Sequence, residues 1–250
     1  MDLNNIIESL WREVDEKKRV AEKDPQYSST ITNQHNSSLA EVANLYSWWL
    51  EHPDVRKRIF LEGKTKAQRV KELKKISKEG KSRAESVWQY LANRKSIRES
   101  FSPALILDVG RIIDPNNYGF RNHTVTLNLN YTPPNPAKVY DRVEECTEKV
   151  RYMKNPVEAA ITIHLLLTGI QPFRDGNKRT ARILQNRWLY EHSYPPVTIH
   201  PSERQIYIKL LESALIGYRD DDLKMMGSFY SFMGSKINRH LEEALSGTDI

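Results

Sequence analysis

Residues 170–182 read Ile-Gln-Pro-Phe-Arg-Asp-Gly-Asn-Lys-Arg-Thr-Ala-Arg, a short loop that runs directly into a basic helix. Gly176 removes a side chain where backbone N–H groups could close on an oxyanion, and Asp175 offers a carboxylate to a divalent cation. Three further residues supply hydrogen-bond donors near the start of the helix: Asn177, Arg179 and Arg182. The stretch therefore predicts a site for a phosphate-bearing ligand, such as a nucleotide with Mg²⁺.

This stretch resembles the signature of the Fic/Doc family, His-x-Phe-x-Asp/Glu-Gly/Ala-Asn-Gly/Lys-Arg-x-x-Arg. The resemblance implies a metal site at Asp175 that holds Mg²⁺, and a site for ATP or another nucleoside triphosphate. It also implies that Tyr207 lies on a helix behind the base. The nucleotide-binding residues carried over from the family pattern are Gly176, Asn177, Lys178, Arg179 and Arg182.

Gln171 occupies the position at which the family has its histidine. In the family this histidine is the general base that accepts the proton of a Ser, Thr or Tyr hydroxyl on a protein target, as the hydroxyl attacks a nucleotide phosphate. A carboxamide has no protonation equilibrium near neutral pH, so we expect a loss of about 10²–10⁴-fold in the rate of transfer. The sequence leaves open whether the glutamine is native or replaces a histidine.

Lys178 leaves the transferred group open. The AMP-transferring branch of the family usually has Gly at this position, whereas the Doc branch has Lys and transfers the terminal phosphate. Gly176 matches the first branch and Lys178 the second. Both AMP transfer and phosphoryl transfer therefore stay possible on the resemblance.

Residues 118–130 alternate apolar and polar side chains, which predicts a half-buried strand or hairpin. The resemblance places the flap of the family here. Three apolar residues of this strand are expected to dock a target segment by adding a strand: Val125, Leu127 and Leu129.

The helix that leads into the loop has clear start signals. Asn155 fits an N-cap, Pro156 a first-turn position and Glu158 a capping-box partner, and an apolar run follows as far as Ile170. Most other windows also repeat apolar residues at helical spacing. We therefore expect a mainly α fold of the Fic/Doc type with a β-hairpin flap, and a family match over about residues 101–238.

The first hundred residues are predicted to be a helical region that precedes a Fic-like core with C-terminal helices at 101–250. A first helix is expected over 1–22 and a polar loop over 26–36. Ser37 or Ser38 would then cap a helix through Trp49. One class of Fic proteins has an inhibitory helix with the pattern Ser/Thr-x-x-x-Glu-Gly/Asn, whose Glu pairs with the second motif arginine. The helix beginning at Ser37 resembles it up to Glu41, but Val42 departs from the pattern, so a plain surface helix is the alternative.

The charge is uneven. Residues 54–98 contain fifteen Lys and Arg against five Asp and Glu, whereas the whole chain of 250 residues has a net charge of +6. Such a segment can bind nucleic acid, but charged helix faces are commonly just solvated, so nucleic acid is an improbable partner. Three hypotheses follow: a weak transferase, a pseudoenzyme that uses the nucleotide pocket for binding, and an interaction protein that uses the basic face.

The remaining composition predicts a protein of a reducing compartment. One cysteine excludes an internal disulfide, and no apolar run approaches the ~18 residues of a membrane helix. The amino-terminal residues lack the basic start and apolar core of a signal peptide. We expect a cytoplasmic protein, or one delivered to another cell without a standard signal peptide, and a homodimer is left open.

Overall fold

The computed structural model describes residues 3–42, 65–94, 96–127 and 129–246, and most of these residues are helical. The helices in the order of the chain are α1 (Leu3–Ala21), α2 (Tyr27–Val42), α5 (Lys66–Ala92), α6 (Ile97–Ser100), α7 (Pro103–Ile113), α8 (Val139–Tyr152), α9 (Pro156–Ile170), α10 (Asn177–Glu191), α11 (Arg204–Asp220) and α12 (Leu223–Ser246). Short 3₁₀ turns at Pro136–Lys138 and Pro201–Glu203 precede α8 and α11. The predicted mainly α class is confirmed.

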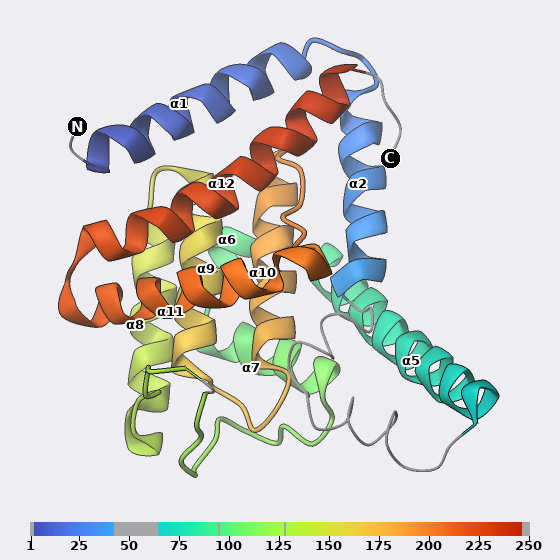
Figure 1. Ribbon diagram of the computed structural model, residues 1–250, viewed down its shortest axis with the longest axis vertical. Coiled ribbons are helices and arrows are strands. Elements are labelled where there is room, and N and C mark those ends of the chain that lie inside the picture. Colours follow the sequence, from blue (N-terminus) through green and yellow to red (C-terminus); the bar gives the residue numbers. More distant parts are fainter. Residues whose placement is uncertain (1–2, 43–64, 95, 128, 247–250) are drawn as a thin grey trace.

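The helices α8, α9 and α10 stand side by side, while α11 and α12 cross one face of them (Figure 1). The helix α1 lies along α12, and α2 and α5 pack against α10 from the other side. In this arrangement α9 is central. Every residue from 159 to 170 is buried, which agrees with an apolar sequence that has no polar face.

The start of α9 agrees with its sequence signals except for one contact. Asn155 Oδ1 accepts hydrogen bonds from the N–H groups of Val157 at 2.9 Å and Glu158 at 3.0 Å, and Pro156 occupies the first turn. The capping box predicted for Glu158 is wrong. Its carboxylate accepts no hydrogen bond from the N–H of Asn155 or from any other described residue. This carboxylate instead lines a cavity beside α1.

The predicted loop at 26–36 is also wrong, because α2 begins at Tyr27 and includes both Ser37 and Ser38. The composition of α2 is polar, yet Tyr27, Ile31 and His35 are buried at four-residue spacing. These side chains lie on one helix face, so packing against the rest of the molecule overrides weak helix propensity. The expected continuation through Trp49 lies outside the described residues.

The segment between α7 and α8, residues 114–135, contains no strand among its described residues, so the predicted hairpin is wrong. Val125, Leu127 and Leu129 are nonetheless partly buried, whereas Thr124 and Thr126 are exposed. The alternation of apolar and polar residues therefore corresponds to a segment with one side facing the protein and one side facing solvent. It forms no ladder because no strand lies beside it in the described chain.

The buried apolar side chains form one cluster, from Trp11 in α1 to Leu241 in α12. Ile31 and Leu91 join it from the first hundred residues, and the division at residue 100 stays a prediction. Cys146 packs inside, and burial raises the pKa of its thiol to about 12. No described helix has the length and apolar character needed to span a membrane.

Candidate functional site

The site lies at the loop that joins α9 to α10. Gln171 ends α9 in the left-handed region, with φ of 51°. Its Nε2 donates to the carbonyl of Thr168 at 2.6 Å, and its Oε1 accepts from Asn177 Nδ2 at 3.1 Å. Residues with a Cβ seldom occupy this region, so these bonds stabilise an otherwise unfavourable turn. The glutamine is 8% exposed and its carboxamide is part of the loop.

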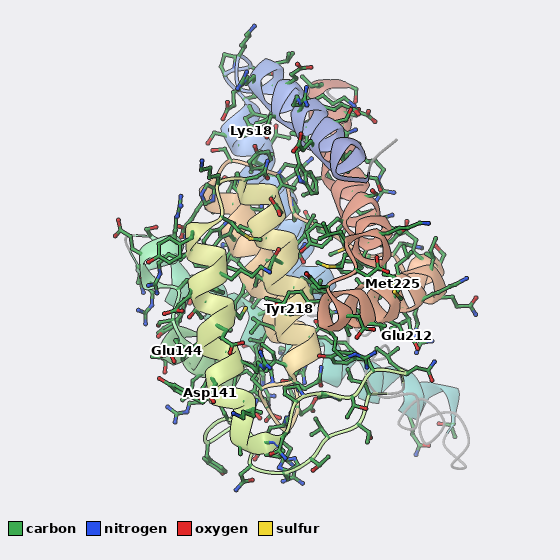
Figure 2. All side chains as sticks on the ribbon, turned by 90° about the vertical axis from the view of Figure 1, so that its left-hand side faces the viewer. Lys18, Asp141, Glu144, Glu212, Tyr218 and Met225 are labelled. Atoms are coloured by element: carbon green, nitrogen blue, oxygen red, sulfur yellow. The ribbon has the colours of Figure 1, made fainter. Side chains whose placement is uncertain are left out.

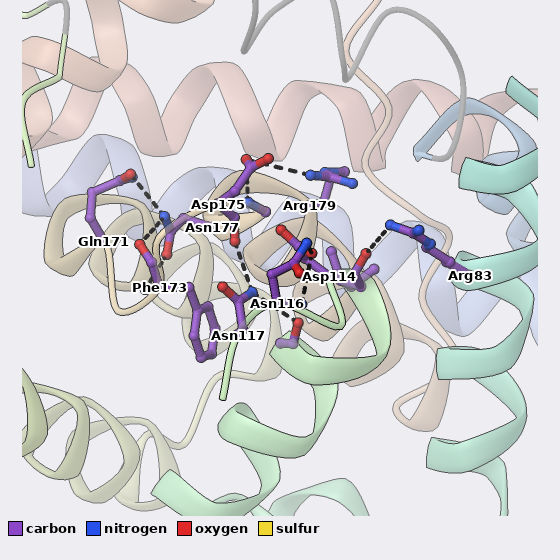
Figure 3. Close-up of polar contacts among 12 residues, drawn as sticks. Arg83, Asp114, Asn116, Asn117, Gln171, Phe173, Asp175, Asn177 and Arg179 are labelled. Carbon is purple, nitrogen blue, oxygen red and sulfur yellow. Dashed lines mark hydrogen bonds and ion pairs between the residues drawn. The ribbon is translucent and has the colours of Figure 1, made fainter. Parts of the chain in front are cut away.

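Asn177 locks the loop from the first turn of α10. Its Oδ1 accepts from Phe173 N–H at 2.7 Å and its Nδ2 donates to Phe173 carbonyl oxygen at 2.9 Å, as Figure 3 shows. Both polar atoms of the side chain are therefore used within the loop. In this geometry Asn177 positions the loop, and a direct contact of its side chain with a nucleotide stays a prediction.

Gly176 has φ of 80° and directly precedes α10. A Cβ at this position would lie 2.8 Å from Ile113 Cγ2 and 3.5 Å from Arg179 Nη2, so the space is available only to glycine. The N–H groups in the first turn of an α-helix carry a partial positive charge, and Gly176 directly precedes that end of α10. A phosphate could therefore approach the backbone closely at this turn, as binding to N–H groups requires.

Asp175 is the only sequence-predicted metal ligand, and its side chain is 38% exposed at the mouth of the loop. Its Oδ1 lies 3.5 Å from Arg179 Nη2 (Figure 3). Among the described residues, no group of three His, Cys, Asp or Glu could hold a metal ion. The residues present therefore fit Mg²⁺, which binds through one or two carboxylates together with phosphate oxygens and water, and they do not form an all-protein cage.

The cationic residues of the motif gather at the same helix. Arg182 is 6% exposed, the Arg179 side chain is 13% exposed, and Lys178 is partly buried. Burial, followed by the charge of Arg182, lowers the pKa of His164 to about 3, and Lys178 adds to the same effect. The start of α10 therefore concentrates positive charge, as an anion site needs.

His164 and Tyr207 form a buried pair behind the loop. Because Gln185 Oε1 only accepts, His164 Nδ1 carries the proton and donates to it at 2.7 Å. The hydroxyl of Tyr207 then donates to His164 Nε2 at 2.8 Å. The Tyr207 side chain is fully buried, with its ring beside Phe229, so a contact of this residue with a base stays a prediction.

Arg121 belongs to the site and sequence reasoning gave it no role. It is 5% exposed, and its Nε donates to the carbonyl of Gln171 at 2.7 Å while its Nη2 lies 3.3 Å from the carbonyl oxygen of Ile170. The same guanidinium donates to the carbonyls of His123 at 2.9 Å and Pro134 at 2.6 Å. It thus ties residues 114–135 to the carbonyl end of α9, where the helix dipole favours a cation. Because every acceptor of the Arg121 guanidinium is a backbone oxygen, no pattern of side chains in the sequence could have revealed these hydrogen bonds.

Asn117 makes a second bridge that the sequence did not indicate. Its Nδ2 donates to the carbonyls of Gly110 and Asp175, each at 3.0 Å (Figure 3). Gly110 also admits the Phe173 ring, since a Cβ there would lie 2.2 Å from Phe173 Cζ. The helix α7, the segment after it and the loop are therefore fitted to one another.

The helix that contains Glu41 packs against α10. The Nε2 of His35 donates to the carbonyl of Tyr194 at 2.8 Å, and its ring contacts the rings of Trp88 and Tyr190. Burial lowers the pKa of His35 to about 3. The side chain of Glu41 lies outside the described residues, so its pairing with Arg182 stays a prediction.

Comparison with known proteins gives a match of residues 100–189 to the model described as the Fic/DOC family. The chain is 34% identical over 107 residues to protein adenylyltransferase Fic of Aedes aegypti, and 36% identical over 107 residues to that of Drosophila willistoni. Each alignment covers 41% of this chain and 21% of the relative, so the match spans about a fifth of the length of these curated relatives.

Solved structures extend the similarity over almost the whole chain. A Fic domain containing signaling protein from Bacteroides thetaiotaomicron has a TM-score of 0.70 at 18% identity, with 96% of this chain and 99% of that chain covered. The structure of IbpAFic2 in complex with adenylylated Cdc42 has a TM-score of 0.52 at 15% identity, with 90% and 70% covered. The described residues therefore have the Fic fold, and residues 100–189 match the model of the Fic/DOC family.

Proposed function

We propose that the protein binds a nucleoside triphosphate with Mg²⁺ and transfers AMP, or the terminal phosphoryl group, to a hydroxyl of a protein target. The observation that carries the proposal is the left-handed Gly176 at the start of α10, between the carboxylate of Asp175 and the guanidinium of Arg179. The name of the relatives, protein adenylyltransferase, supports AMP transfer. Gln171 cannot accept the proton that the attacking hydroxyl loses, because a carboxamide is not a base near neutral pH.

Each residue has an assigned part in this proposal. The first N–H groups of α10, with Lys178, Arg179 and Arg182, bind phosphate oxygens. Asp175 holds Mg²⁺ together with phosphate oxygens and water, and the ion supplies positive charge opposite the charge that develops on the phosphate. Val125, Leu127 and Leu129, which are partly buried in a segment without a strand, contact the target segment that presents the hydroxyl through their apolar side chains.

Gln171 accepts or donates hydrogen bonds but removes no proton, so transfer is slow rather than abolished. A hydroxyl that attacks a phosphate loses its proton late, and the cationic groups still stabilise the developing charge. A pseudoenzyme is the second candidate. The observation in its favour is that the Gln171 carboxamide is already engaged by Thr168 and Asn177, which stabilises a loop that binds without turnover.

Labelled ATP distinguishes the two candidates. The native protein, Gln171→His and Gln171→Ala are each incubated with α-labelled or γ-labelled ATP, Mg²⁺ and a cell lysate. We expect Gln171→His to raise protein labelling about 10²-fold or more, the scale of one positioned base, while Gln171→Ala gives no rise. The α label reports AMP transfer and the γ label reports phosphoryl transfer. Silence of all three with every target tried supports the pseudoenzyme.

Binding is tested separately from transfer. ATP with Mg²⁺ should raise the thermal midpoint of the native protein by mass action, and Arg179→Ala should abolish the rise. Arg111→Ala is the control, since Arg111 is exposed on α7 and lies outside the motif. Absence of both a midpoint shift and calorimetric heat at millimolar ATP would refute the proposed site.

Regulation by Glu41 has its own test. If its carboxylate competes for Arg182, then Glu41→Gly should tighten triphosphate binding. Unchanged affinity would leave the helix Tyr27–Val42 with a structural role only.

A further inference from the structure

A cavity of about 250 Å³ opens where α1, α8, α9 and α12 meet, at the end of α9 opposite the loop of residues 171–176. Figure 2 faces this side of the molecule, with α8 and α9 in front and α1 above them. Five apolar or aromatic side chains line it: Trp11, Met153, Leu223, Met226 and Tyr230. Three charged side chains complete the lining: Glu8, Lys149 and Glu158. No part of the nucleotide site contributes to it.

Glu158 is the informative member of this set. Its carboxylate is partly buried, and it makes no hydrogen bond or ion pair with any residue that the structure describes. Burial raises the pKa of this carboxyl above its ordinary value, although the charge of Lys149 opposes the rise. Partial burial of a carboxylate without a partner is unfavourable, and a cation placed beside it would relieve the cost.

Lys149 does not provide that cation at bonding distance. Its Nζ lies 4.8 Å from the centroid of the Tyr218 ring, on α11, and no ion pair joins it to Glu158. Glu8, from α1, brings a second carboxylate to the same cavity. Because Glu8 is exposed and its carboxylate lies 3.7 Å from Arg12 Nη2 on the same helix, Glu158 is the carboxylate of the lining that has no ion-pair partner among the described residues.

The rest of the lining suits the alkyl part of a cationic ligand. Trp11, which lines the cavity, is 5% exposed. Tyr230 is 5% exposed, and its hydroxyl is engaged with Thr162 at 2.8 Å. Aromatic rings attract ammonium and guanidinium groups, and the flexible methionine side chains can pack against the methylene chain of such a ligand.

We propose that this cavity binds an alkylammonium or alkylguanidinium group, with Glu158 as its counter-ion and the aromatic and methionine side chains around its methylenes. The volume is below the usual range of drug-sized sites, so the ligand is small: a free amine or a single lysine or arginine side chain of another protein. The inference does not rest on the proposed nucleotide chemistry.

The test uses ¹³C-methyl-methionine NMR of the full chain, because Met153 and Met226 line the cavity. Three probes of similar length are titrated: n-pentylamine, 1-pentanol and pentanoate. We expect saturable shifts of these two methyl signals with the amine, and binding at least about tenfold weaker for the alcohol and the acid. Equal binding of amine and alcohol, or no saturable shift with the amine, overturns the proposal.

Two variants test whether Glu158 is the counter-ion of the amine. Glu158→Gln keeps the shape of the side chain and should remove the preference for the amine, whereas Glu144→Gln, on the exposed face of α8, should leave it unchanged (Figure 2). Retention of the preference in a Glu158→Gln protein whose unliganded spectrum is native-like contradicts the proposal.

A second arm identifies the source of the cation. Nα-acetyl-lysine N-methylamide binding as tightly as n-pentylamine supports a lysine side chain of a partner, and selective binding of n-pentylamine supports a free amine. Failure of both compounds to bind rules out the proposed site.

Discussion

The loop of residues 171–176 and the segment of residues 114–135 lie against each other, yet they are held in different ways. The loop is bound by its own neighbours, since Gln171 contacts Thr168 and Asn177 contacts Phe173. The longer segment has no helix or strand among its described residues, and Tyr118 in it is 83% exposed. A short loop with local side-chain bonds keeps its shape, whereas the segment depends on a few distant anchors.

Arg121 is the main anchor, so its replacement should have the largest effect. Arg121→Met leaves the carbonyls of Gln171, His123 and Pro134 without this donor, and we expect a loss of about 3 kcal/mol in the free energy of unfolding. Chemical denaturation measures it. Arg111→Met is the control, because Arg111 is exposed and, among the described residues, its side chain donates a hydrogen bond only to the carbonyl of Tyr118. Equal losses in both variants would remove the distinction between anchor and surface.

Replacement of Asn177 tests the local hydrogen bonds that hold the loop of residues 171–176. Asn177→Ala removes the bonds to Phe173 N–H, Phe173 carbonyl and Gln171, and should cost about 2 kcal/mol. Asn116→Ala, in the exposed part of the segment, should cost less than about 0.5 kcal/mol. Thermal unfolding of both variants provides the comparison, and a stability of Asn177→Ala equal to that of Asn116→Ala would contradict it.

Acid should weaken the helices around the loop through His164. Its folded pKa is about 3, below the ordinary value of 6.5, so the neutral form is favoured on folding. The stability that this provides is present above pH 6.5 and lost as the pH falls from 6.5 toward 3. Between pH 7 and pH 5 the loss is about 2 kcal/mol from this residue.

The acid test compares pH profiles of stability rather than single values. His164→Gln should flatten the profile below pH 6.5, the ordinary pKa from which His164 departs. His123→Gln, at an exposed position of residues 114–135, should not change the slope of the free energy of unfolding against pH. An unaltered slope in His164→Gln would mean that the acid response comes from other buried groups, such as His35.

Two glycines give the smallest and most direct contrast. Gly176→Ala places a Cβ 2.8 Å from Ile113 Cγ2 at φ of 80°, and we expect a loss of about 1–2 kcal/mol. Gly119→Ala, in the segment, meets no atom within 4 Å and should be neutral or stabilising by up to about 1 kcal/mol. Differential scanning calorimetry measures both, and destabilisation of Gly119→Ala beyond that of Gly176→Ala would reverse the comparison.

Local signals were sufficient where a helix starts or the backbone turns. Asn155 and Pro156 predict the start of α9, as observed. The same kind of reasoning failed for residues 26–36, because the polar composition of α2 conceals the face formed by Tyr27, Ile31 and His35. That face is stabilised by contacts with α10 and α5, which no window of α2 contains.

The sequence by itself determined the mainly α class, the loop of residues 171–176 that leads into α10, and the glycine at its turn, because these depend on neighbours within a few positions. Tertiary structure alone decided that residues 125–129 form no ladder, that Arg121 binds backbone carbonyls and that Glu158 faces a cavity. Each of these depends on groups far away in the chain. Their energies come from packing, desolvation and carbonyl orientation, which have no pattern along the sequence.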